Sequence, residues 1–149
     1  MMVRFLRILA AILSGIALAF SFAPFDEAWI VWGWMWLLLP LLWTVPGKGR
    51  CLKGFGLGWL AGMGFWVINL KWLGTVTWPG ALALSAYLSA YFGLFGAFAA
   101  GPVNPCRVKY ERGKIVRDRA RQTLRSLGYA TLLGGFWCGL EWVRGWLMT

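Results

Sequence analysis

Basic stretches and long apolar runs alternate along this chain, and no other feature constrains its fold as strongly. All of the 15 Lys and Arg residues except Lys71 and Arg144 fall in three short stretches. These stretches lie within residues 4–7, 48–53 and 107–125. If each apolar run crosses a bilayer, all three stretches lie on one side, which the positive-inside rule identifies as the cytoplasm. The sequence therefore predicts an all-α, multi-pass transmembrane helix bundle with a cytoplasmic N-terminus.

Five membrane spans can be drawn, since a helix needs about 20 apolar residues, or somewhat fewer, to cross. They cover residues 5–22, 29–45, 54–74, 80–100 and 126–148. Pro24 ends the first span in an outer turn, and residues 102–125 form a basic cytoplasmic loop that touches anionic head groups. The N-terminus also resembles a secretory signal peptide, but the alternation of charge favours an uncleaved first span.

The composition excludes several kinds of partner and site. Hydrophobic residues make up 60% of the chain and charged residues only 13%, which is typical of a membrane protein. The net charge of +10 is explained by orientation in the membrane, so no nucleic-acid partner is expected. The chain has no His, and Cys51, Cys106 and Cys138 lack metal-ligand spacing. We therefore expect no metal, no cofactor and no Ser-His-Asp triad.

Small residues recur at every fourth position in three of the spans. The three sets are Ala11, Gly15, Ala19 and Ala23; Gly54, Gly58 and Gly62; and Ser85, Ser89, Gly93, Ala97 and Gly101. Residues four apart share a helix face, and small side chains let helix backbones approach closely in lipid. The pattern predicts a compact bundle, although apolar sequences are also simply rich in Gly and Ala.

Four polar residues in the spans are candidate substrate-binding residues. Glu141 and Arg144 share one face of the last span, near its outer end. They form either an internal ion pair or a site in which Arg144 holds a phosphate or carboxylate and Glu141 orients it. Asn69 and Lys71, at the outer end of the third span, would complete an outer-leaflet pocket. Alternatively, Asn69 makes a helix–helix hydrogen bond and Lys71 reaches the interface.

Three tryptophans, Trp137, Trp142 and Trp146, flank the Glu141–Arg144 pair. Their rings could cradle acyl chains. Tryptophans at this depth are more often simple anchors at the membrane interface. Both interpretations stay open on the sequence.

Four motifs follow one another along the chain and together are typical of one family. They are SFAPFD at 21–26, INLKW at 68–72, AYLSAY at 86–91 and EWVRGWLMT at 141–149. In this order and spacing they resemble the N-terminal membrane part of bacterial apolipoprotein N-acyltransferases. The resemblance covers most of the chain.

The resemblance implies an integral inner-membrane enzyme that moves an acyl chain from a phospholipid to the N-terminal Cys of a lipoprotein. In that family a nitrilase-like periplasmic domain with a Glu-Lys-Cys triad follows further spans, and this sequence stops before it, at Thr149. None of the three cysteines matches the catalytic one. We therefore expect the membrane part of a truncated or split enzyme, inactive alone, with phospholipid as its partner and a lipoprotein substrate only when joined to a catalytic domain. The rival interpretation is a self-standing membrane protein, such as a transporter-like or scaffold subunit.

Overall fold

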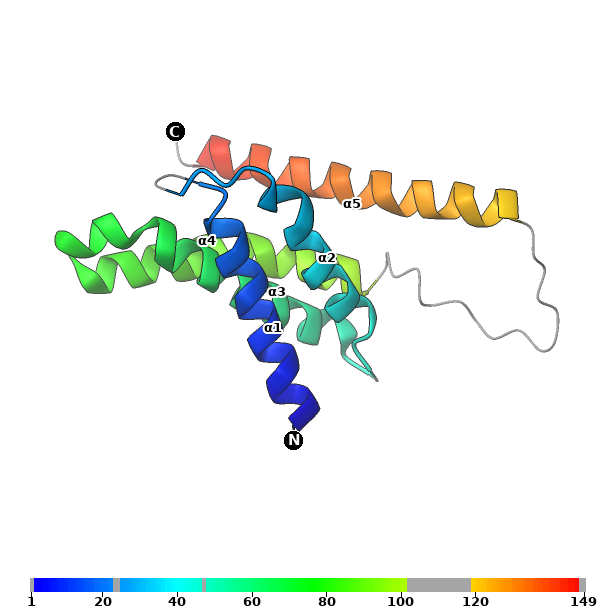
Figure 1. Ribbon diagram of the computed structural model, residues 1–149, viewed down its shortest axis with the longest axis horizontal. Helices are drawn as coiled ribbons and strands as arrows, with labels where there is room; N and C mark the ends of the chain where they lie inside the picture. Colours follow the sequence, from blue (N-terminus) through cyan, green and yellow to red (C-terminus); the bar gives the residue numbers. More distant parts are fainter. Residues whose placement is uncertain (1, 23–24, 47, 102–118, 148–149) are drawn as a thin grey trace.

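Every regular element in the described part of the chain is helical, which confirms the all-α prediction. The structure is a computed structural model that describes residues 2–22, 25–46, 48–101 and 119–147. The elements are α1 (Met2–Ala19), α2 (Ile30–Trp43), α3 (Arg50–Asn69), the 3-10 helix η1 (Lys71–Thr75), α4 (Trp78–Ala100) and α5 (Arg119–Leu147), as Figure 1 shows. Within these residues, two helices, α3 and α4, are long and apolar enough to cross a membrane, and a shorter apolar helical stretch covers Gly33–Trp43.

Helices α3 and α4 form an antiparallel hairpin at the centre of the molecule. Their contact is made by small residues, because a Cβ placed on Gly54 would overlap Gly96, and one on Gly58 would overlap the Phe92 carbonyl. Gly62 faces Ser89 in the same way. The face predicted for close packing in α3 is therefore buried against the main chain of α4, as expected for helices that associate by dispersion contacts.

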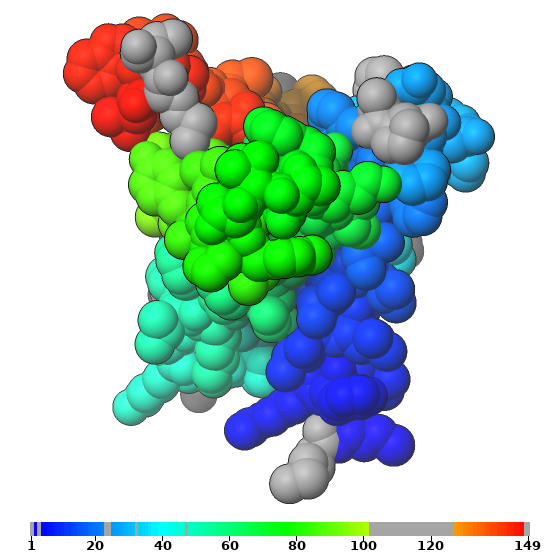
Figure 2. Space-filling view, turned by 90° about the vertical axis from the view of Figure 1, so that its left-hand side faces the viewer, coloured from blue at the N-terminus to red at the C-terminus, as the bar shows by residue number. Residues whose placement is uncertain are grey.

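Helix α1 packs on the other side of α3 through a second set of close approaches. Gly15 lies against the main chain of Ala61, and Gly64 lies against the carbonyl of Ile12. The neighbouring members of the α1 stripe, Ala11 and Ala19, are buried. Figures 1 and 2 show that α1 crosses the α3–α4 hairpin steeply, whereas α5 runs along α4. The helices do not share one direction, so the fold does not by itself establish five spans.

Three buried serine hydroxyls in the bundle are satisfied inside their own helices. Ser14, Ser85 and Ser89 each donate to a carbonyl three or four residues earlier, at 2.6–2.8 Å. Such back-bonding removes the need for a partner on another helix. A polar link between α3 and α4 comes instead from Trp59, whose Nε1 donates to the Ala86 carbonyl at 3.1 Å.

The connection between α3 and α4 differs from the predicted span boundaries. Helix α3 ends at Asn69, and the chain continues as η1, so Lys71 lies outside the regular helix. Gly74 and the β-branched residues that follow it are poor helix formers. Helix α4 then begins at Trp78, where the Thr77 hydroxyl accepts a bond from the Gly80 N–H at 3.4 Å. Pro79 is tolerated there, because the first turn of a helix leaves its N–H groups unpaired.

Helix α5 begins seven residues before the predicted start of the last span, which was 126. Residues 119–125, assigned from the sequence to the basic loop, are helical. They contain Arg, Ala, Gln and Leu, which favour helix, and no Gly or Pro. The rest of that loop, residues 102–118, lies outside the described residues.

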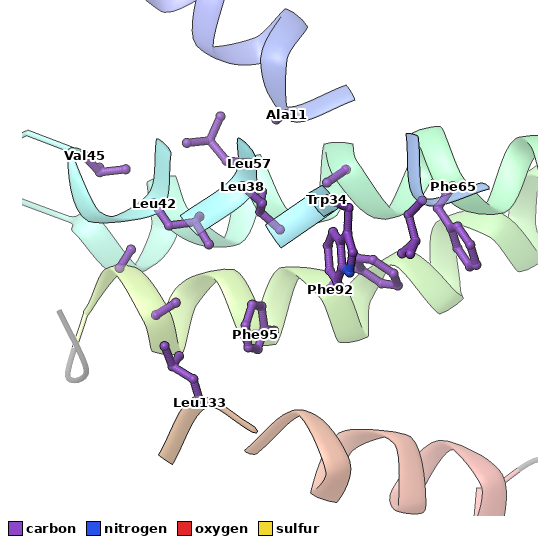
Figure 3. Packing of buried hydrophobic residues seen from close by; sticks show 14 of the residues in the cluster. Ala11, Trp34, Leu38, Leu42, Val45, Leu57, Phe65, Phe92, Phe95 and Leu133 are labelled. Carbon is purple, nitrogen blue, oxygen red and sulfur yellow. The ribbon is translucent and has the colours of Figure 1, made fainter. Parts of the chain in front are cut away.

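Large apolar side chains fill the space between α2 and the α3–α4 hairpin (Figure 3). Trp34 of α2 points toward Phe92 of α4, with ring centroids 5.9 Å apart. Phe92 also contacts Phe65 of α3, at 5.7 Å. Helix α5 adds Leu133 to this buried cluster. The aromatic part of the core therefore lies where four helices approach one another, and it borders the candidate site.

Candidate functional site

A pocket of about 690 Å³ opens among the helices beside the aromatic core. All five α-helices and the turn after α1 contribute residues to its walls, and most of its lining is apolar. Three lining residues that sequence analysis selected are polar or charged: Asn69, Glu141 and Arg144. A mostly apolar cavity of this size with a few convergent polar groups is typical of a small-molecule site.

The Glu141–Arg144 pair forms the charged wall of this pocket. A guanidinium Nη2 of Arg144 contacts a carboxylate oxygen of Glu141 one helical turn away, so the ion pair, one of the two alternatives that the sequence left open, is formed in this structure. Both side chains are half-buried, 26% exposed for Arg144 and 35% for Glu141. The Arg144 guanidinium carbon also lies 5.2 Å from the centroid of the Trp66 ring. This distance allows a cation–π contact, which holds Arg144 between α5 and α3.

Asn69 lines the pocket from the last turn of α3. Its Nδ2 donates to the Phe65 carbonyl at 3.0 Å, within its own helix. This bond lies within α3, so it is not the helix–helix hydrogen bond that was the alternative for Asn69, and the substrate-binding role of Asn69 stays a prediction. The bond fixes the side chain along α3 and leaves its carbonyl oxygen and second N–H for the pocket.

Lys71 is not part of the pocket lining, in contrast to the expectation that all four polar residues would meet. It is exposed in η1, with its Nζ 6.0 Å from the centroid of the Phe25 ring. The break after Asn69 explains this, because a residue beyond the end of a helix no longer follows that helix's face. The structure thus unites three of the four candidates and leaves Lys71 beside the turn that follows α1.

The three tryptophans of α5 separate into two environments. Trp137 lines the pocket, and its ring centroid lies 5.8 Å from that of Trp34 and 5.0 Å from that of Phe92. Trp142 and Trp146 face away from the bundle and are 72% and 71% exposed. Only Trp137 has the position of a side chain that could cradle an apolar ligand.

Trp66 is a pocket residue that sequence analysis missed. Its ring supports Arg144, and its indole N–H is buried with no hydrogen-bond partner among the described residues. Tryptophans in apolar spans are normally interpreted as interface anchors, so the residue type did not indicate a binding role. Its spacing did carry a signal, because Trp66 lies three residues before Asn69 and therefore shares its helix face.

The turn after α1 packs over the outer end of α3. Phe22 lies 5.3 Å from Phe65 between ring centroids, and Phe22 also lines the pocket. This contact brings the motif at 21–26 beside those at 68–72 and 141–149. A separate hydroxyl pair on α4, Tyr87 and Tyr91 at 3.2 Å, lies in the remaining motif, at 86–91.

Basic residues gather at the opposite end of α1 from the pocket. Arg7 Nη2 donates to the Thr44 carbonyl at 3.0 Å, so the first basic stretch meets the end of α2. Lys53 Nζ donates to the Pro46 carbonyl at 2.9 Å. The first and second basic stretches therefore lie together, while Leu18 and Phe22, at the other end of α1, line the pocket.

Comparisons with known proteins agree on one family. The family model described as "Apolipoprotein N-acyltransferase N-terminal domain" matches residues 14–149, a range that includes every described residue of the pocket. The chain is also 31% identical, over 95% of its length, to the apolipoprotein N-acyltransferase of Chromobacterium violaceum. It is 25% identical over 97% to that of Shewanella oneidensis, and 32% identical over 93% to that of Gloeobacter violaceus.

These relatives are much longer than the chain. The aligned region covers 25% or 26% of each of them, so the chain spans about a quarter of their length. No solved structure matches. Because the family model covers nearly the whole sequence, this chain belongs to the apolipoprotein N-acyltransferase N-terminal domain family.

Proposed function

We propose that this chain is the inner-membrane part of an apolipoprotein N-acyltransferase and that its pocket binds an outer-leaflet phospholipid. One observation carries the proposal: Arg144 stands in the wall of a mostly apolar pocket, with Glu141 on one side and Trp66 on the other. In this reading the guanidinium binds the lipid phosphate and the apolar wall takes an acyl chain. The family to which the chain belongs supplies the reaction class.

The chemistry of Arg144 suits a phosphate. Its planar guanidinium offers five N–H donors, of which the contact with Glu141 uses one nitrogen. Charge-assisted bonds of this kind are about twice as strong as neutral ones. A cation in an apolar span is costly unless it is paired, and such residues are functional candidates by default. Glu141 balances the positive charge of Arg144 and fixes the orientation of its planar guanidinium.

The proposed topology has five spans, at residues 5–22, 29–45, 54–74, 80–100 and 126–148, with the N-terminus in the cytoplasm. The meeting of Arg7 with the end of α2, and of Lys53 with the start of the α2–α3 turn, supports a common basic side. The pocket lies toward the other end of α1, which would face the periplasm.

Acyl transfer itself is proposed to need a catalytic domain joined to this part, with a lipoprotein as the acceptor. A nucleophilic Cys requires a neighbouring base or cation to form its thiolate. The two described cysteines, Cys51 and Cys138, are free and do not line the pocket. We therefore expect that the chain binds lipid and does not transfer acyl groups.

Lipid binding tests the proposal directly. The purified chain, delipidated in detergent, is titrated with phosphatidylglycerol and with diacylglycerol, and retained lipid is counted by native mass spectrometry. We expect the phosphate-bearing lipid to bind more tightly, and Arg144→Gln to lose that preference. Trp142→Phe, on the exposed face of the same helix, is the matched control. Equal binding of the two lipids by the unmodified chain would contradict the proposal.

Acyl transfer is tested in two further arms. The chain alone, with phospholipid and a diacylated lipopeptide, should give no triacylated product. In a full-length relative carrying the same change, Arg144→Lys should fold normally and lose much of its transfer activity, because Lys keeps the charge and loses the two-pronged donor set. Wild-type transfer in that variant would leave only a structural role for Arg144.

A further inference from the structure

We propose that the indole N–H of Trp66 is a second hydrogen-bond donor to the phosphate that Arg144 binds, which makes Trp66 a binding residue of the site. The inference rests on the proposed function, since it concerns the same phospholipid in the same pocket. The phosphate would then accept a hydrogen bond from Trp66 of α3 in addition to its contact with the charge of Arg144 on α5. The phosphate would then bridge two helices that meet at the pocket.

The buried N–H of Trp66 is the starting observation. Its Nε1 is inaccessible and has no hydrogen-bond partner among the described residues. A buried donor without an acceptor is costly, so such groups normally find a partner. Other indoles of this chain have one: Trp59 donates to the Ala86 carbonyl at 3.1 Å, and Trp29 to a Glu27 carboxylate oxygen at 2.7 Å. The indole N–H of Trp66 therefore needs an acceptor that is not among the described residues.

The surroundings of Trp66 indicate what kind of acceptor fits. The residue lines the pocket, and the Arg144 guanidinium carbon lies 5.2 Å from its ring centroid. Arg144 covers a face of the ring, and the N–H has no accessible surface in this structure, so the proposed bond requires the indole to turn toward the pocket when the lipid binds. An acceptor that binds the remaining N–H groups of Arg144 is therefore adjacent to the indole.

Charge decides between acceptors. Arg144 favours an anion, and a phosphodiester offers two charged oxygens, one for each donor. In apolar surroundings a hydrogen bond to a charged oxygen is stronger than in water. The rest of the pocket wall is made of rings and aliphatic chains, including Trp34, Phe92 and Trp137. An anion with apolar tails therefore fits better than free phosphate, and the proposed ligand is a membrane phospholipid.

Trp66→Phe is the decisive change, because it keeps an aromatic ring under Arg144 and removes the N–H together with part of the indole. Two quantities are measured on the full chain in detergent: the affinity for phosphatidylglycerol and the thermal midpoint without lipid. We expect affinity to fall roughly 10-fold to 100-fold, as for loss of a bond to a charged group. The lipid-free midpoint should fall less than in Trp59→Phe, since both changes remove the same side-chain volume but only Trp66→Phe also removes an unpaired buried donor.

A structural role gives the opposite pattern. If the indole N–H is satisfied within the protein or by water, Trp66→Phe lowers the lipid-free midpoint as much as Trp59→Phe does and leaves affinity unchanged, which would overturn the inference. Trp59→Phe is the control for that behaviour, because its donor is already bonded to Ala86. It should lower the midpoint without changing lipid affinity.

A spectroscopic measurement covers the case in which Trp66→Phe fails to fold. In the unmodified chain, the ¹⁵N-labelled indole resonance of Trp66 should shift during titration with phosphatidylglycerol and not with diacylglycerol. Inorganic phosphate should neither shift it nor displace the lipid. An unmoved resonance at saturating phosphatidylglycerol overturns the inference, and a shift caused equally by inorganic phosphate overturns the choice of lipid as ligand.

Arg144→Gln separates this inference from the proposed function. If that variant loses phosphatidylglycerol while Trp66→Phe binds it like the unmodified chain, only the role of Trp66 is wrong. If neither variant changes binding, the pocket does not bind phospholipid through this wall, and both proposals are wrong. Loss of affinity in both variants, with a smaller fall of the lipid-free midpoint in Trp66→Phe than in Trp59→Phe, is the result we expect.

Discussion

Glycines in the α3–α4 hairpin and glycines in α5 have opposite surroundings. In the hairpin, a Cβ on Gly54, Gly58 or Gly96 would overlap main-chain atoms of the facing helix. In α5, a Cβ would meet no atom of the described residues within 4 Å at five glycines, namely Gly128, Gly134, Gly135, Gly139 and Gly145. The same residue type marks a tight interface in one place and an uncovered surface in the other. Glycine content alone therefore does not locate a helix–helix contact.

The difference also explains where the pocket lies. Helices that meet through glycines approach until their backbones touch, and no cavity remains between them. Helix α5 meets the bundle through large side chains instead, with Trp137 packed on Phe92 and Phe95 at 5.0 and 5.2 Å between ring centroids. These rings hold α5 away from α3 and leave room in which Arg144 can stand over Trp66.

The largest expected effect concerns whether α5 crosses the membrane as α3 and α4 do. A reporter active only in the periplasm should be active when fused after Thr149 and silent when fused after Arg112, because the basic stretch is retained in the cytoplasm. The measurement is reporter activity in cells with matched expression of the two fusions. Activity after Arg112 and silence after Thr149 would invert the proposed topology.

The next largest effect is on the stability of the α3–α4 hairpin. Gly58→Leu forces a branched side chain against the Phe92 carbonyl and should destabilise the bundle by about 3 kcal/mol or more. We would measure the midpoint of thermal aggregation in detergent. Gly56→Leu is the control, because a Cβ on this glycine of the same helix meets nothing within 4 Å. Equal midpoints for the two variants would mean that the hairpin interface does not hold the bundle together.

A smaller loss of stability is expected when the Glu141–Arg144 ion pair of α5 is broken. Glu141→Gln or Arg144→Gln leaves one charge unpaired, and each should cost about 1–2 kcal/mol, since the pair is half-buried. The double variant should recover part of the loss, because the two changes are coupled. Thermal midpoints of the four proteins form the test. Strictly additive losses would show that the ion pair contributes nothing to stability.

The sequence predicted best those features that depend on local spacing. Gly54, Gly58 and Gly62 lie on one face of α3, and Glu141 and Arg144 lie one turn apart on one face of α5, because helical periodicity alone decides both. Lys71 was misplaced because the helix ends after Asn69, a boundary that depends on weak propensities. Boundaries of this kind are the least certain part of any sequence-based assignment.

Features set by contacts between helices were out of reach of the sequence. The steep crossing of α1 depends on which small residues meet, here Gly15 with Ala61, and many small residues in the chain could have met instead. Trp66 was missed for a similar reason. Its N–H matters only because the pocket opens beside it and Arg144 covers its ring, and neither fact is visible along the chain.

The smallest effect tests whether the glycine surface of α5 is uncovered in the isolated chain. Gly135→Ala adds a methyl group where the described structure has open space, and it replaces a poor helix former by the best one. The variant should therefore be more stable by about 0.5–1 kcal/mol, seen as a rise of a few degrees in the thermal midpoint in detergent. Gly58→Ala, the matched change in the hairpin, should lower the midpoint, because even one methyl group overlaps the Phe92 carbonyl. A fall in the midpoint for Gly135→Ala would mean that this surface is in tight contact after all, with a second copy of the chain, and light scattering should then report a dimer that the substitution dissociates.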